Sequence, residues 1–510
     1  MTGDSGQLSI HDILFCRDQD PDHHAIESPG LLPLTYRDLR EQVVFVIKTL
    51  NANALHRNDR IAVIVPSGPE TAAIIVSVMA GFTCIPLNPQ HNSTDFESFF
   101  SRLRIQAVIV PHGCETAARA VAGARNIPVF ELIPVPGKAG KFEIRPPASG
   151  VAGEAEFAIE SDISHILLTA GTTSGQKIVP ISQKQSCLLR QTRTKPLTIT
   201  KNDRCLHIVP FYHGMGIGLP LLDILFAGGT VICIKNFISS DFFPLLETER
   251  PTLYIAGPAH HQGILRELKK VPPDALKHNS LRMILSSSAL LPDTVYHGLE
   301  TLLGAPVVEQ YAMSETGIIS LNFPPKRGSV GIPVVEHLQI LDENGNGAGP
   351  FEQGELVVRG EAVFSGYEDA PDENRAAFFN GWFRTGDRGY LDDEGYLFIT
   401  GRIKELINKG GVKISPAEID NALMTHPLVR EAMVFAVQDP VLGEDIAAMV
   451  VRKREDLTEN DLRIYLLDRL TPSKLPRRIY FVDAIPKNAS GKPLRSIGTG
   501  LYGGPGFQGY

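Results

Sequence analysis

The segment LLTAGTTSGQKIVP, residues 167–180, places small hydroxyl residues and glycines directly after an apolar run and includes one lysine. The apolar run predicts a buried strand, and the turn that follows exposes backbone N–H groups with little side-chain bulk. Such a loop is suited to holding phosphate. A Walker A loop is excluded, because it has four residues between its glycines and then Gly-Lys-Ser/Thr. Here three residues separate Gly171 from Gly175, and Ile178 follows Lys177.

Outward from this loop, short apolar runs alternate with helical patterns from about residue 59 onward, beginning with IAVIV at 61–65. This alternation is typical of α/β layers with largely parallel sheets. From His337 the pattern changes to LQILDENGNG and GELVVRG, which predict antiparallel strands joined by an Asn/Gly turn, as in a small β-barrel. We therefore expect an α/β fold. Its large N-terminal domain, residues 1–402, would contain two α/β layered subdomains and a β-barrel-like part at about 337–400.

A smaller α+β domain is expected at residues 403–495. Ser415-Pro416-Ala417-Glu418 supplies a hydroxyl N-cap, a proline at N1 and a glutamate at N3, so a helix should begin there and run toward His426. Thr458 with Asp461 predicts a second helix, and EAMVFAVQ and IAAMVVRK between the two predict strands. Six glycines among the last fifteen residues predict a flexible tail at 496–510, or the start of a linker.

Composition narrows the class of protein. The 510 residues are 43% hydrophobic and 21% charged, as in soluble globular proteins. The net charge of −8 argues against a general role on nucleic acid or on a membrane surface, so any anion site must be local. Six cysteines without a C-x-x-C pair indicate neither a zinc site nor a disulfide framework, and fit a reduced compartment. With no apolar stretch long enough to span a bilayer and no signal-peptide pattern, we expect a cytoplasmic protein without an integral membrane segment.

Six short motifs follow one another along the chain in a specific order. They are TAGTTSGQK at 169–177, PFYH at 210–213, QYAMSE at 310–315, FRTGD at 383–387, GRIK at 401–404 and KNASGK at 487–492. Together they resemble the AMP-forming adenylating superfamily, which comprises acyl-CoA synthetases, nonribosomal-peptide adenylation domains and luciferases. The resemblance covers essentially residues 10–495. It is closest to the oxalate-CoA and small-acyl-CoA ligase branch, with coumarate-CoA ligases close behind.

The resemblance implies an AMP-forming acid–thiol ligase. A carboxylate would attack the α-phosphate of Mg-ATP to give an acyl-adenylate and pyrophosphate, and a thiol would then displace AMP. ATP, Mg²⁺ and coenzyme A are the implied cofactor and co-substrates, and a small-molecule carboxylate is the implied substrate.

The phosphate loop of the superfamily holds the β- and γ-phosphates with hydroxyl and backbone N–H groups. Ala170, Ser174, Gln176 and Ile178 replace the usual Ser, Gly, Pro and Gly of that loop. The residues that the resemblance assigns to ATP are Thr169, Gly171, Thr172, Thr173, Ser174, Lys177, Ser288, Ala289, Gln310, Tyr311, Ala312, Met313, Ser314, Asp387 and Arg402.

Roles follow from the same resemblance. The hydroxyl of Ser314 would touch the α-phosphate, and Glu315 would hold Mg²⁺, which in proteins is often bound by one carboxylate and several phosphate oxygens. Asp387 would accept hydrogen bonds from both ribose hydroxyls, because a carboxylate offers several lone pairs, and Arg402 would join it. Taken alone, each of these residues would more often be a solvated or ion-paired surface group.

The C-terminal motifs imply a mobile lid. Lys492 matches the lysine that bridges the substrate carboxylate and the α-phosphate and offsets their repulsion. Lys404 lies at the hinge position, about which the small domain would rotate between the two half-reactions. Gly410 and Gly411 match the glycines beside the pantetheine tunnel. His213 resembles the histidine beside the carboxylate pocket, although a lone histidine is usually structural and a general-base role is not required here.

The acyl pocket is assigned to His213, Met215, His260, Ser286 and Ile318. Met215 and Ile318 stand where, in our alignment, oxalate enzymes carry histidines. Without those polar groups a second carboxylate would be buried unpaired, so we expect an apolar or aromatic monocarboxylate. For the pair His260-His261, the alternative is that one of them is simply helix surface.

Three functions remain open from the sequence. The first is an acid–CoA ligase, favoured by the Gly410-Gly411 pair and the complete C-terminal domain. The second is an enzyme that loads an acyl carrier protein, to which the glycine-rich tail could lead. The third is a catalytically silent nucleotide-binding protein, which would not need Lys492. Neither the acid nor the oligomeric state can be predicted from the sequence.

Overall fold

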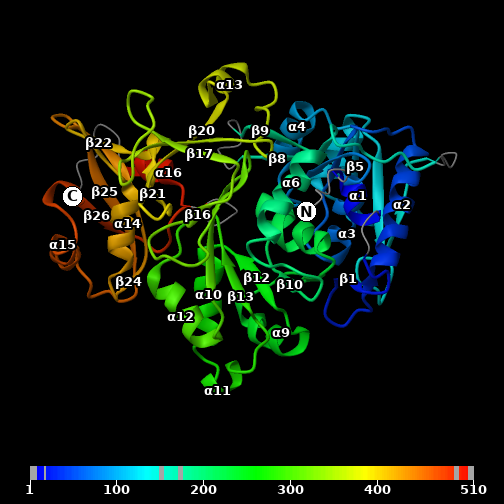
Figure 1. Ribbon diagram of the computed structural model, residues 1–510, viewed down its shortest axis with the longest axis horizontal. Coiled ribbons are helices and arrows are strands. Elements are labelled where there is room, and N and C mark those ends of the chain that lie inside the picture. Colours follow the sequence, from blue (N-terminus) through cyan, green and yellow to red (C-terminus); the bar gives the residue numbers. More distant parts are fainter. Residues whose placement is uncertain (1–7, 16–18, 149–153, 170–175, 488–492, 503–510) are drawn as a thin grey trace.

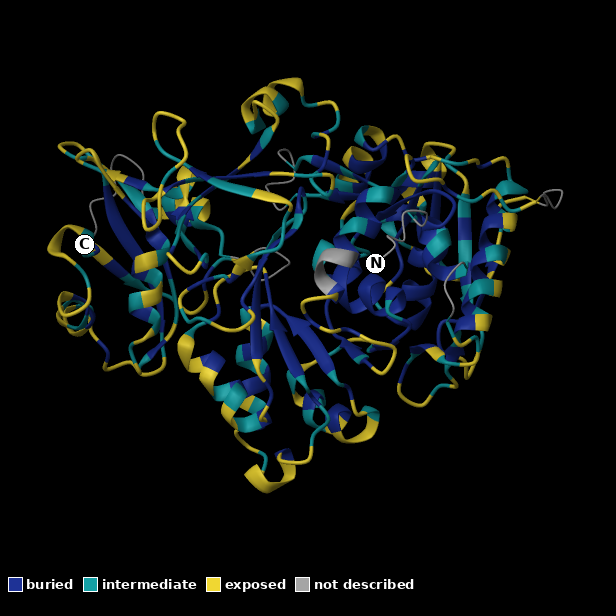
Figure 2. Ribbon diagram, in the orientation of Figure 1, coloured by how far each residue is buried: buried dark blue, intermediate teal, exposed yellow. Residues whose placement is uncertain are grey.

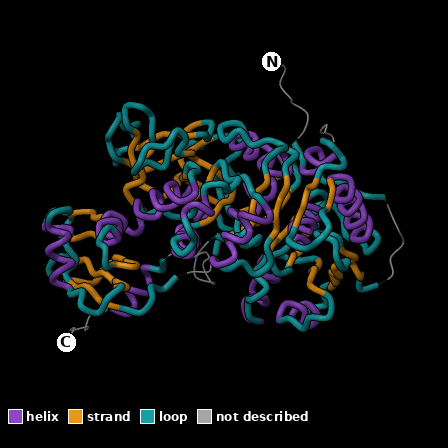
Figure 3. Tube along the Cα trace, turned by 90° about the horizontal axis from the view of Figure 1, so that it is seen from below, coloured by secondary structure: helices purple, strands orange, loops and turns teal. Residues whose placement is uncertain are grey.

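The computed structural model of the 510-residue chain describes residues 8–15, 19–148, 154–169, 176–487 and 493–502. Two large α/β sheets lie side by side, a smaller antiparallel sheet covers one end of them, and a C-terminal α+β unit follows (Figure 1). Views from two directions place that C-terminal unit at one end of the molecule (Figures 1 and 3).

The first sheet has seven strands in the order β7-β6-β5-β3-β4-β8-β9. Its five inner strands are parallel, and the edge strands β7 and β9 are antiparallel to their neighbours. Apolar runs such as Ile61-Ala62-Val63 are at most 2% exposed, as expected for parallel strands covered on both faces. The strands are β3 (Arg60–Val63), β4 (Thr83–Pro86), β5 (Ala107–Pro111), β6 (Val129–Pro134), β7 (Phe142–Arg145), β8 (Ile163–Leu168) and β9 (Ile178–Ser182).

Helices cover both faces of this sheet (Figure 2). An Asn92–Asp95 capping box starts α4, and Pro69 lies at the first position of α3, both standard helix starts. The helices are α1 (Ile10–Phe15), α2 (Tyr36–Asn51), α3 (Pro69–Met79), α4 (Ser93–Arg102), α5 (Ala117–Ala124) and α6 (Gln183–Thr194).

The second sheet has nine strands in the order β16-β15-β14-β13-β12-β10-β11-β1-β2. Strands β14, β13, β12, β10, β11 and β1 are mutually parallel. The parallel α/β layers predicted from the sequence are therefore confirmed. The strands are β1 (His24–Glu27), β2 (Leu34–Thr35), β10 (Arg204–His207), β11 (Thr230–Cys233), β12 (Leu253–Ala256), β13 (Met283–Ser286), β14 (Val307–Met313), β15 (Gly317–Leu321) and β16 (Ile332–Pro333).

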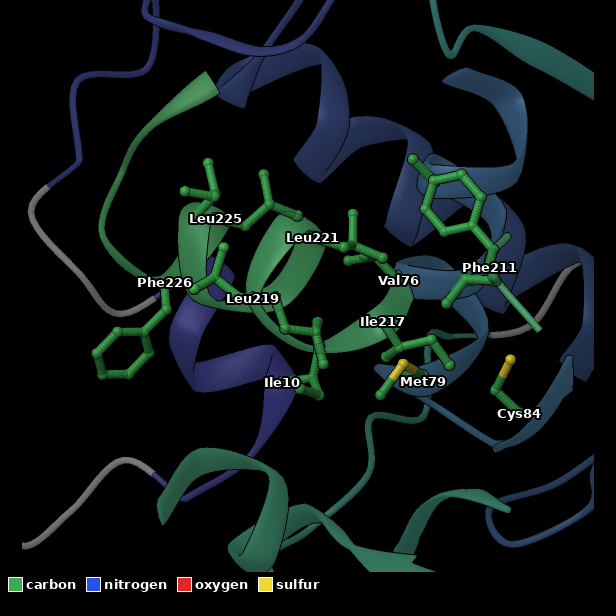
Figure 4. Packing of buried hydrophobic residues seen from close by; sticks show 14 of the residues in the cluster. Ile10, Val76, Met79, Cys84, Phe211, Ile217, Leu219, Leu221, Leu225 and Phe226 are labelled. Carbon is green, nitrogen blue, oxygen red and sulfur yellow. The ribbon is translucent and has the colours of Figure 1, made fainter. Parts of the chain in front are cut away.

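A continuous apolar core joins the two sheets. Ile217, Leu219 and Leu221 pack among Val76 and Met79 of α3 (Figure 4). They come from a helical segment formed by α7 (Gly214–Ile217), the π-helix η1 (Gly218–Asp223) and α8 (Ile224–Phe226). The remaining helices of this region are η2 (Ser239–Asp241), α9 (Phe242–Glu249), α10 (Pro258–Leu268), α11 (Pro273–Leu276) and α12 (Asp293–Leu303).

The third sheet occupies the segment for which a small β-barrel is expected. It has five antiparallel strands in the order β17-β18-β20-β19, with β21 also pairing with β20. Hydrogen bonds between the described strands do not close this sheet into a ring, so the expected barrel is an open sheet. Its elements are β17 (His337–Leu341), β18 (Gly354–Arg359), α13 (Pro371–Ala377), β19 (Phe378–Phe379), β20 (Trp382–Leu391) and β21 (Leu397–Arg402).

The C-terminal unit is built on a five-stranded sheet in the order β23-β22-β25-β24, with β26 pairing with β25. The second predicted helix begins with a Thr458–Asp461 capping box, as expected, and the helix predicted from Ser415 spans Pro416–Met424. Its elements are η3 (Ile403–Glu405), β22 (Ile407–Lys409), β23 (Val412–Ile414), α14 (Pro416–Met424), β24 (Val429–Asp439), β25 (Gly443–Arg452), α15 (Glu459–Leu467), η4 (Pro472–Lys474), β26 (Arg478–Phe481) and α16 (Arg495–Tyr502).

The expectation of a flexible tail from residue 496 is wrong for its first part. Residues 495–502 form α16, which packs on β24. Gly498 lies against the ring of Phe435, and Tyr502 stacks on Tyr480 with 4.1 Å between ring centroids. The two glycines of this helix lower its intrinsic propensity, but burial against the sheet compensates for that loss. Residues 503–510 lie outside the described residues.

Among the described helices, none combines the length and the apolar composition required to cross a membrane.

Candidate active site

Strands β10, β12, β13 and β14 are parallel neighbours, so their carboxyl ends meet at one edge of the second sheet. In open α/β sheets this edge is where ligands bind. His213 follows β10, Ser288 follows β13, and Gln310 lies within β14. Ser288 Oγ lies 3.8 Å from the sulfur of Met215, so the segments after β10 and β13 are in contact. The fold thus brings together residues that the sequence analysis took from separate motifs.

Three buried polar atoms at this edge have no hydrogen-bond partner: His213 Nε2, Ser286 Oγ and Gln310 Oε1. Buried polar groups in native proteins are nearly always paired, so three such atoms at one edge indicate a place for a polar ligand. Burial lowers the pKa of His213, which leaves its imidazole neutral at pH 7. Ser288 has a φ of 76°, a conformation rare for a residue with a side chain and frequent at functional sites.

The base of the phosphate loop is a β-hairpin between β8 and β9. The backbone N–H of Thr169 donates to the carbonyl of Lys177 at 3.0 Å, and the N–H of Lys177 donates to Thr169 Oγ1 at 2.9 Å. The predicted strand before the loop is therefore confirmed. The predicted phosphate-binding residues Gly171, Thr172, Thr173 and Ser174 lie outside the described residues.

Asp387 and Arg402 lie opposite each other on β20 and β21. Arg402 Nε donates to Asp387 Oδ1 at 2.9 Å, and the hydroxyl of Tyr311 donates to Asp387 Oδ2. The carboxylate is only 3% exposed, whereas the arginine side chain is 45% exposed. Burial, and then the charge of Asp387, raise the pKa of Tyr311 well above its usual value, so this tyrosine stays a donor. A buried carboxylate acceptor beside an accessible guanidinium group is suited to a diol next to phosphate.

Glu315 follows β14 and is 7% exposed. The hydroxyl of Tyr367 donates to Glu315 Oε1 at 2.8 Å. The described residues contain no group of three or more His, Cys, Asp or Glu side chains that could hold a metal ion alone. A divalent cation at Glu315 would therefore need phosphate oxygens and water as its other ligands, which is the usual coordination of Mg²⁺. The donor set fits Mg²⁺ bound together with a nucleotide.

The other predicted pocket residues are placed differently. Ile318 is 2% exposed in β15, and Met215 is half-buried. His260 lines a cavity of about 390 Å³ with Phe237 and neighbouring residues, and none of the other predicted pocket residues lines that cavity. The assignment of His260 to the acyl pocket stays a prediction.

His261 is a core residue rather than helix surface. Its side chain is fully buried and lies 3.2 Å from both the Tyr254 hydroxyl and the Leu285 carbonyl. Burial lowers its pKa to about 4. A neutral histidine shared between these two partners has a structural role.

The residues predicted to form the hinge and the coenzyme A tunnel lie at the start of the C-terminal unit. Lys404 is exposed in the short helix η3, which directly follows Arg402. Gly410 and Gly411 have φ of 59° and 89°, which only glycine adopts without strain, and the Gly410 N–H donates to the Leu442 carbonyl at 2.9 Å. Lys492 lies outside the described residues.

The ion pairs of the described C-terminal residues stay within that unit. Arg495 binds Glu405 and Asp420, and Lys409 binds Asp445. Each of the other pairs formed beyond residue 405 in the described chain likewise has both partners there. Among the described residues, the ion pairs of this unit therefore do not fasten it to the preceding sheets.

Comparison with known proteins agrees with this architecture. Residues 16–368 match the family of AMP-binding enzymes, and residues 418–492 match the AMP-binding enzyme C-terminal domain. A probable CoA ligase, CCL9, of Humulus lupulus is 36% identical in an alignment 494 residues long that covers 93% of this chain and 93% of that protein. The oxalate–CoA ligase of Arabidopsis thaliana is 34% identical over 94% of this chain and 95% of its own. ATP-bound MatB from Rhodopseudomonas palustris has a TM-score of 0.87 and 26% identity, over 98% of this chain and 99% of that chain.

Two α/β sheets, a polar site at the carboxyl edge of the second sheet and a C-terminal α+β unit are the arrangement of an adenylate-forming enzyme. The chain belongs to the AMP-binding enzyme family. The resemblance carried by the six sequence motifs is thereby confirmed.

Proposed function

We propose that this chain activates an apolar or aromatic monocarboxylic acid with Mg-ATP and transfers the acyl group to the thiol of coenzyme A. It is an AMP-forming acid–thiol ligase, and relatives that match over more than nine-tenths of its length are named CoA ligases. In the first step a carboxylate oxygen bonds to the α-phosphorus, and the bond to pyrophosphate breaks. In the second step the thiolate attacks the acyl carbon, and AMP leaves with the original carboxylate oxygen.

The chain's own residues have distinct parts in the first step. Asp387, oriented by Tyr311 and Arg402, would accept the ribose hydroxyls and fix the nucleotide. Glu315 would hold Mg²⁺, which when bound neutralises phosphate charge as pyrophosphate departs. The unpaired Gln310 Oε1 and Ser286 Oγ would pair with the bound adenylate. Lys492 would bring a positive charge to the two anions that must meet.

The choice of acid is supported by the lack of charge on the residues predicted to line the acyl pocket. Met215, Ser286 and Ile318 carry no charge, and burial keeps His213 neutral. A second carboxylate would be desolvated there without a cation, which costs several kcal/mol. A hydrocarbon or aromatic ring would instead gain about 25 cal/mol per Å² that it buries.

Coenzyme A is preferred over a carrier protein as the acceptor. The glycine-rich segment from residue 496 favours a carrier protein only if it is a linker. Residues 495–502 instead form a helix packed on the C-terminal sheet. A reduced, cytoplasmic setting suits this chemistry, and the buried Cys84, Cys205 and Cys233 are free thiols.

The test is pyrophosphate release by the full-length protein across a panel of acids, with and without coenzyme A. We expect release with monocarboxylates such as benzoate, cinnamate or butyrate, and formation of the matching thioester. Oxalate and malonate should be at least about tenfold poorer, because the pocket lacks a second cation. Preference for a dicarboxylate would contradict the neutral pocket. Pyrophosphate release without formation of a CoA thioester would support a carrier protein as the acceptor. No pyrophosphate release with any acid would support a catalytically silent nucleotide-binding protein.

A further inference from the structure

Tyr367 contacts two of the residues assigned to Mg-ATP, although no motif assigned it a role. Its side chain is 7% exposed. The hydroxyl donates to Glu315 Oε1 at 2.8 Å, and the ammonium group of Lys177 lies 4.1 Å from the centroid of its ring. The side chain of Tyr367 thus contacts both Glu315, the carboxylate assigned to Mg²⁺, and Lys177, at the base of the predicted phosphate loop.

The segment that carries Tyr367 is fastened to both of these elements. The backbone N–H of Phe364 donates to the Glu315 carbonyl at 2.8 Å, and that of Glu368 donates to the Ile178 carbonyl at 3.1 Å. Arg60 of the first sheet binds the Glu368 carboxylate at 2.8 Å. The position of Tyr367 is therefore fixed relative to the sheet that carries the phosphate loop and to the residue after β14.

The backbone of Tyr367 itself is held by Asn374. The Tyr367 N–H donates to Asn374 Oδ1, and Asn374 Nδ2 donates to the Tyr367 carbonyl, both at 2.8 Å. The ring of Phe364 packs against the Tyr367 ring at 4.8 Å between centroids. Such double fastening leaves the side chain little freedom, as expected for a group that orients others.

We propose that Tyr367 is a positioning residue for Mg-ATP: its hydroxyl orients the Glu315 carboxylate toward the cation, and its ring holds the Lys177 ammonium at the phosphate loop. The proposal rests on the function proposed above. A hydrogen bond to a metal-binding carboxylate fixes which oxygen faces the metal, and loss of such partners typically costs 10- to 100-fold in metal affinity or activity. A cation over an aromatic face gains about 0.5 to 2 kcal/mol, which here would keep the lysine from extending into solvent.

The two contacts can be separated by substitution. Tyr367→Phe removes the hydroxyl but keeps the ring beneath Lys177, whereas Tyr367→Leu removes both. Tyr396→Phe is a matched control, because Tyr396 is also buried, donates to a backbone carbonyl at 3.1 Å and has Lys326 5.0 Å from its ring centroid.

The measurement is acid-dependent exchange of labelled pyrophosphate into ATP, with free Mg²⁺ and ATP varied separately. For Tyr367→Phe we expect the half-saturating Mg²⁺ concentration to rise about tenfold, with little change in KM for ATP at saturating Mg²⁺. Tyr367→Leu should in addition raise KM for ATP at saturating Mg²⁺ by about threefold or more. Tyr396→Phe should change neither quantity. A merely structural role would lower activity without moving the Mg²⁺ dependence.

A half-saturating Mg²⁺ concentration for Tyr367→Phe within twofold of wild type would overturn the proposal for Glu315. Equal KM values for ATP in the Phe and Leu variants would overturn it for Lys177. If Tyr367→Phe does not fold, Asn374→Ala should produce the same Mg²⁺ shift, because it loosens the backbone that holds the ring. Absence of exchange in the wild-type protein would instead count against the proposed function.

Discussion

Asp387 is the side chain that we propose holds the ribose of the nucleotide. It is almost fully buried, accepts hydrogen bonds from Tyr311 and Arg402, and lies beside the carboxyl edge of the second sheet. A buried carboxylate with two donors still has lone pairs for a diol, whereas an amide would offer only one acceptor oxygen.

Asp387→Asn should therefore lower kcat/KM for ATP by roughly 10- to 100-fold, the effect of losing a charged hydrogen-bond acceptor. Steady-state kinetics per mole of folded protein provide the measurement. Asp203→Asn is the matched control, since Asp203 is equally buried and pairs with Arg282 through both carboxylate oxygens away from this edge. The control should lose stability but keep its KM for ATP, and equal kinetic losses in the two variants would contradict a nucleotide role for Asp387.

The sequence assigns roles to Asp387, Arg402 and Glu315 because each lies in a short motif that resembles the family, and the structure pairs Asp387 with Arg402. Tyr367 could not be predicted, because its contacts depend on how the segment after β18 folds back onto Glu315, 52 residues away. Its only local signal is its place after Gly366 in SGYED. Likewise, the sequence could not tell that His261 is a core residue whereas His260 faces a separate cavity.

Among the elements, α16 differs most from expectation. Its glycine content predicts a flexible tail, but a Cβ at Gly498 would lie 2.8 Å from the Phe435 ring, so this glycine is a packing requirement. Gly500 of the same helix has open space around it. A glycine-rich composition does not predict the conformation of this segment, because packing against β24 stabilises the helix.

The two glycines provide a matched pair. Gly500→Ala should leave the C-terminal unit unchanged or stabilise it by up to about 1 kcal/mol through helix propensity. Gly498→Ala should destabilise it by about 1 to 3 kcal/mol through overpacking against Phe435. Limited proteolysis and chemical denaturation of the full-length protein compare the two. A Gly498→Ala variant as stable as Gly500→Ala would mean that α16 does not pack on β24.

The strands and helices behind the active site contain buried neutral histidines, which make stability depend on pH. Burial lowers the pKa of His207 in β10 and of His261 in α10 to about 4, against 6.5 in the unfolded chain. Between pH 4 and pH 6.5 the unfolded state therefore binds more protons than the folded state. The contribution of these two histidines to the free energy of unfolding is complete above pH 6.5 and is lost as the pH falls toward 4. The loss is at most about 3 kcal/mol per histidine.

His261→Gln should make the fall in stability between pH 6.5 and pH 4 shallower, because one proton fewer is taken up on unfolding. The apparent melting temperature measured at several pH values within this range provides the test. His278→Gln, at an exposed position, should leave the pH dependence unchanged. An identical slope in wild type and His261→Gln would show that His261 is not buried neutral.

At the scale of the whole molecule, the parallel sheets were predictable because buried strands read as continuous apolar runs. The open third sheet was not predictable, since closure depends on strand pairings that no local pattern specifies. The described ion pairs of the C-terminal unit are internal, and the exposed segment around Lys404 joins the unit to β21. Both features agree with the proposal that the unit rotates relative to the preceding sheets.

If the C-terminal unit rotates as we propose, the two half-reactions should be separable by substitution. Lys492→Ala should reduce adenylation at least about 100-fold, because the positive charge that offsets the repulsion between the substrate carboxylate and the α-phosphate is lost. Thioester formation from a supplied acyl-adenylate should be largely spared. Lys487→Ala, which removes a lysine paired with Glu431 in the same motif, should affect neither step strongly. Rapid-quench assays of each half-reaction compare them, and equal loss of both steps in Lys492→Ala would contradict the domain rotation.

The central claim is that the acid becomes an acyl-adenylate at the carboxyl edge of the second sheet. The most direct measurement follows oxygen from an acid labelled with ¹⁸O in its carboxylate, converted by the full-length protein with ATP, Mg²⁺ and coenzyme A. The account predicts that the AMP formed carries one labelled oxygen, because the carboxylate oxygen bonded to the α-phosphorus leaves with AMP. Label in inorganic phosphate, or unlabelled AMP beside a formed thioester, would contradict it.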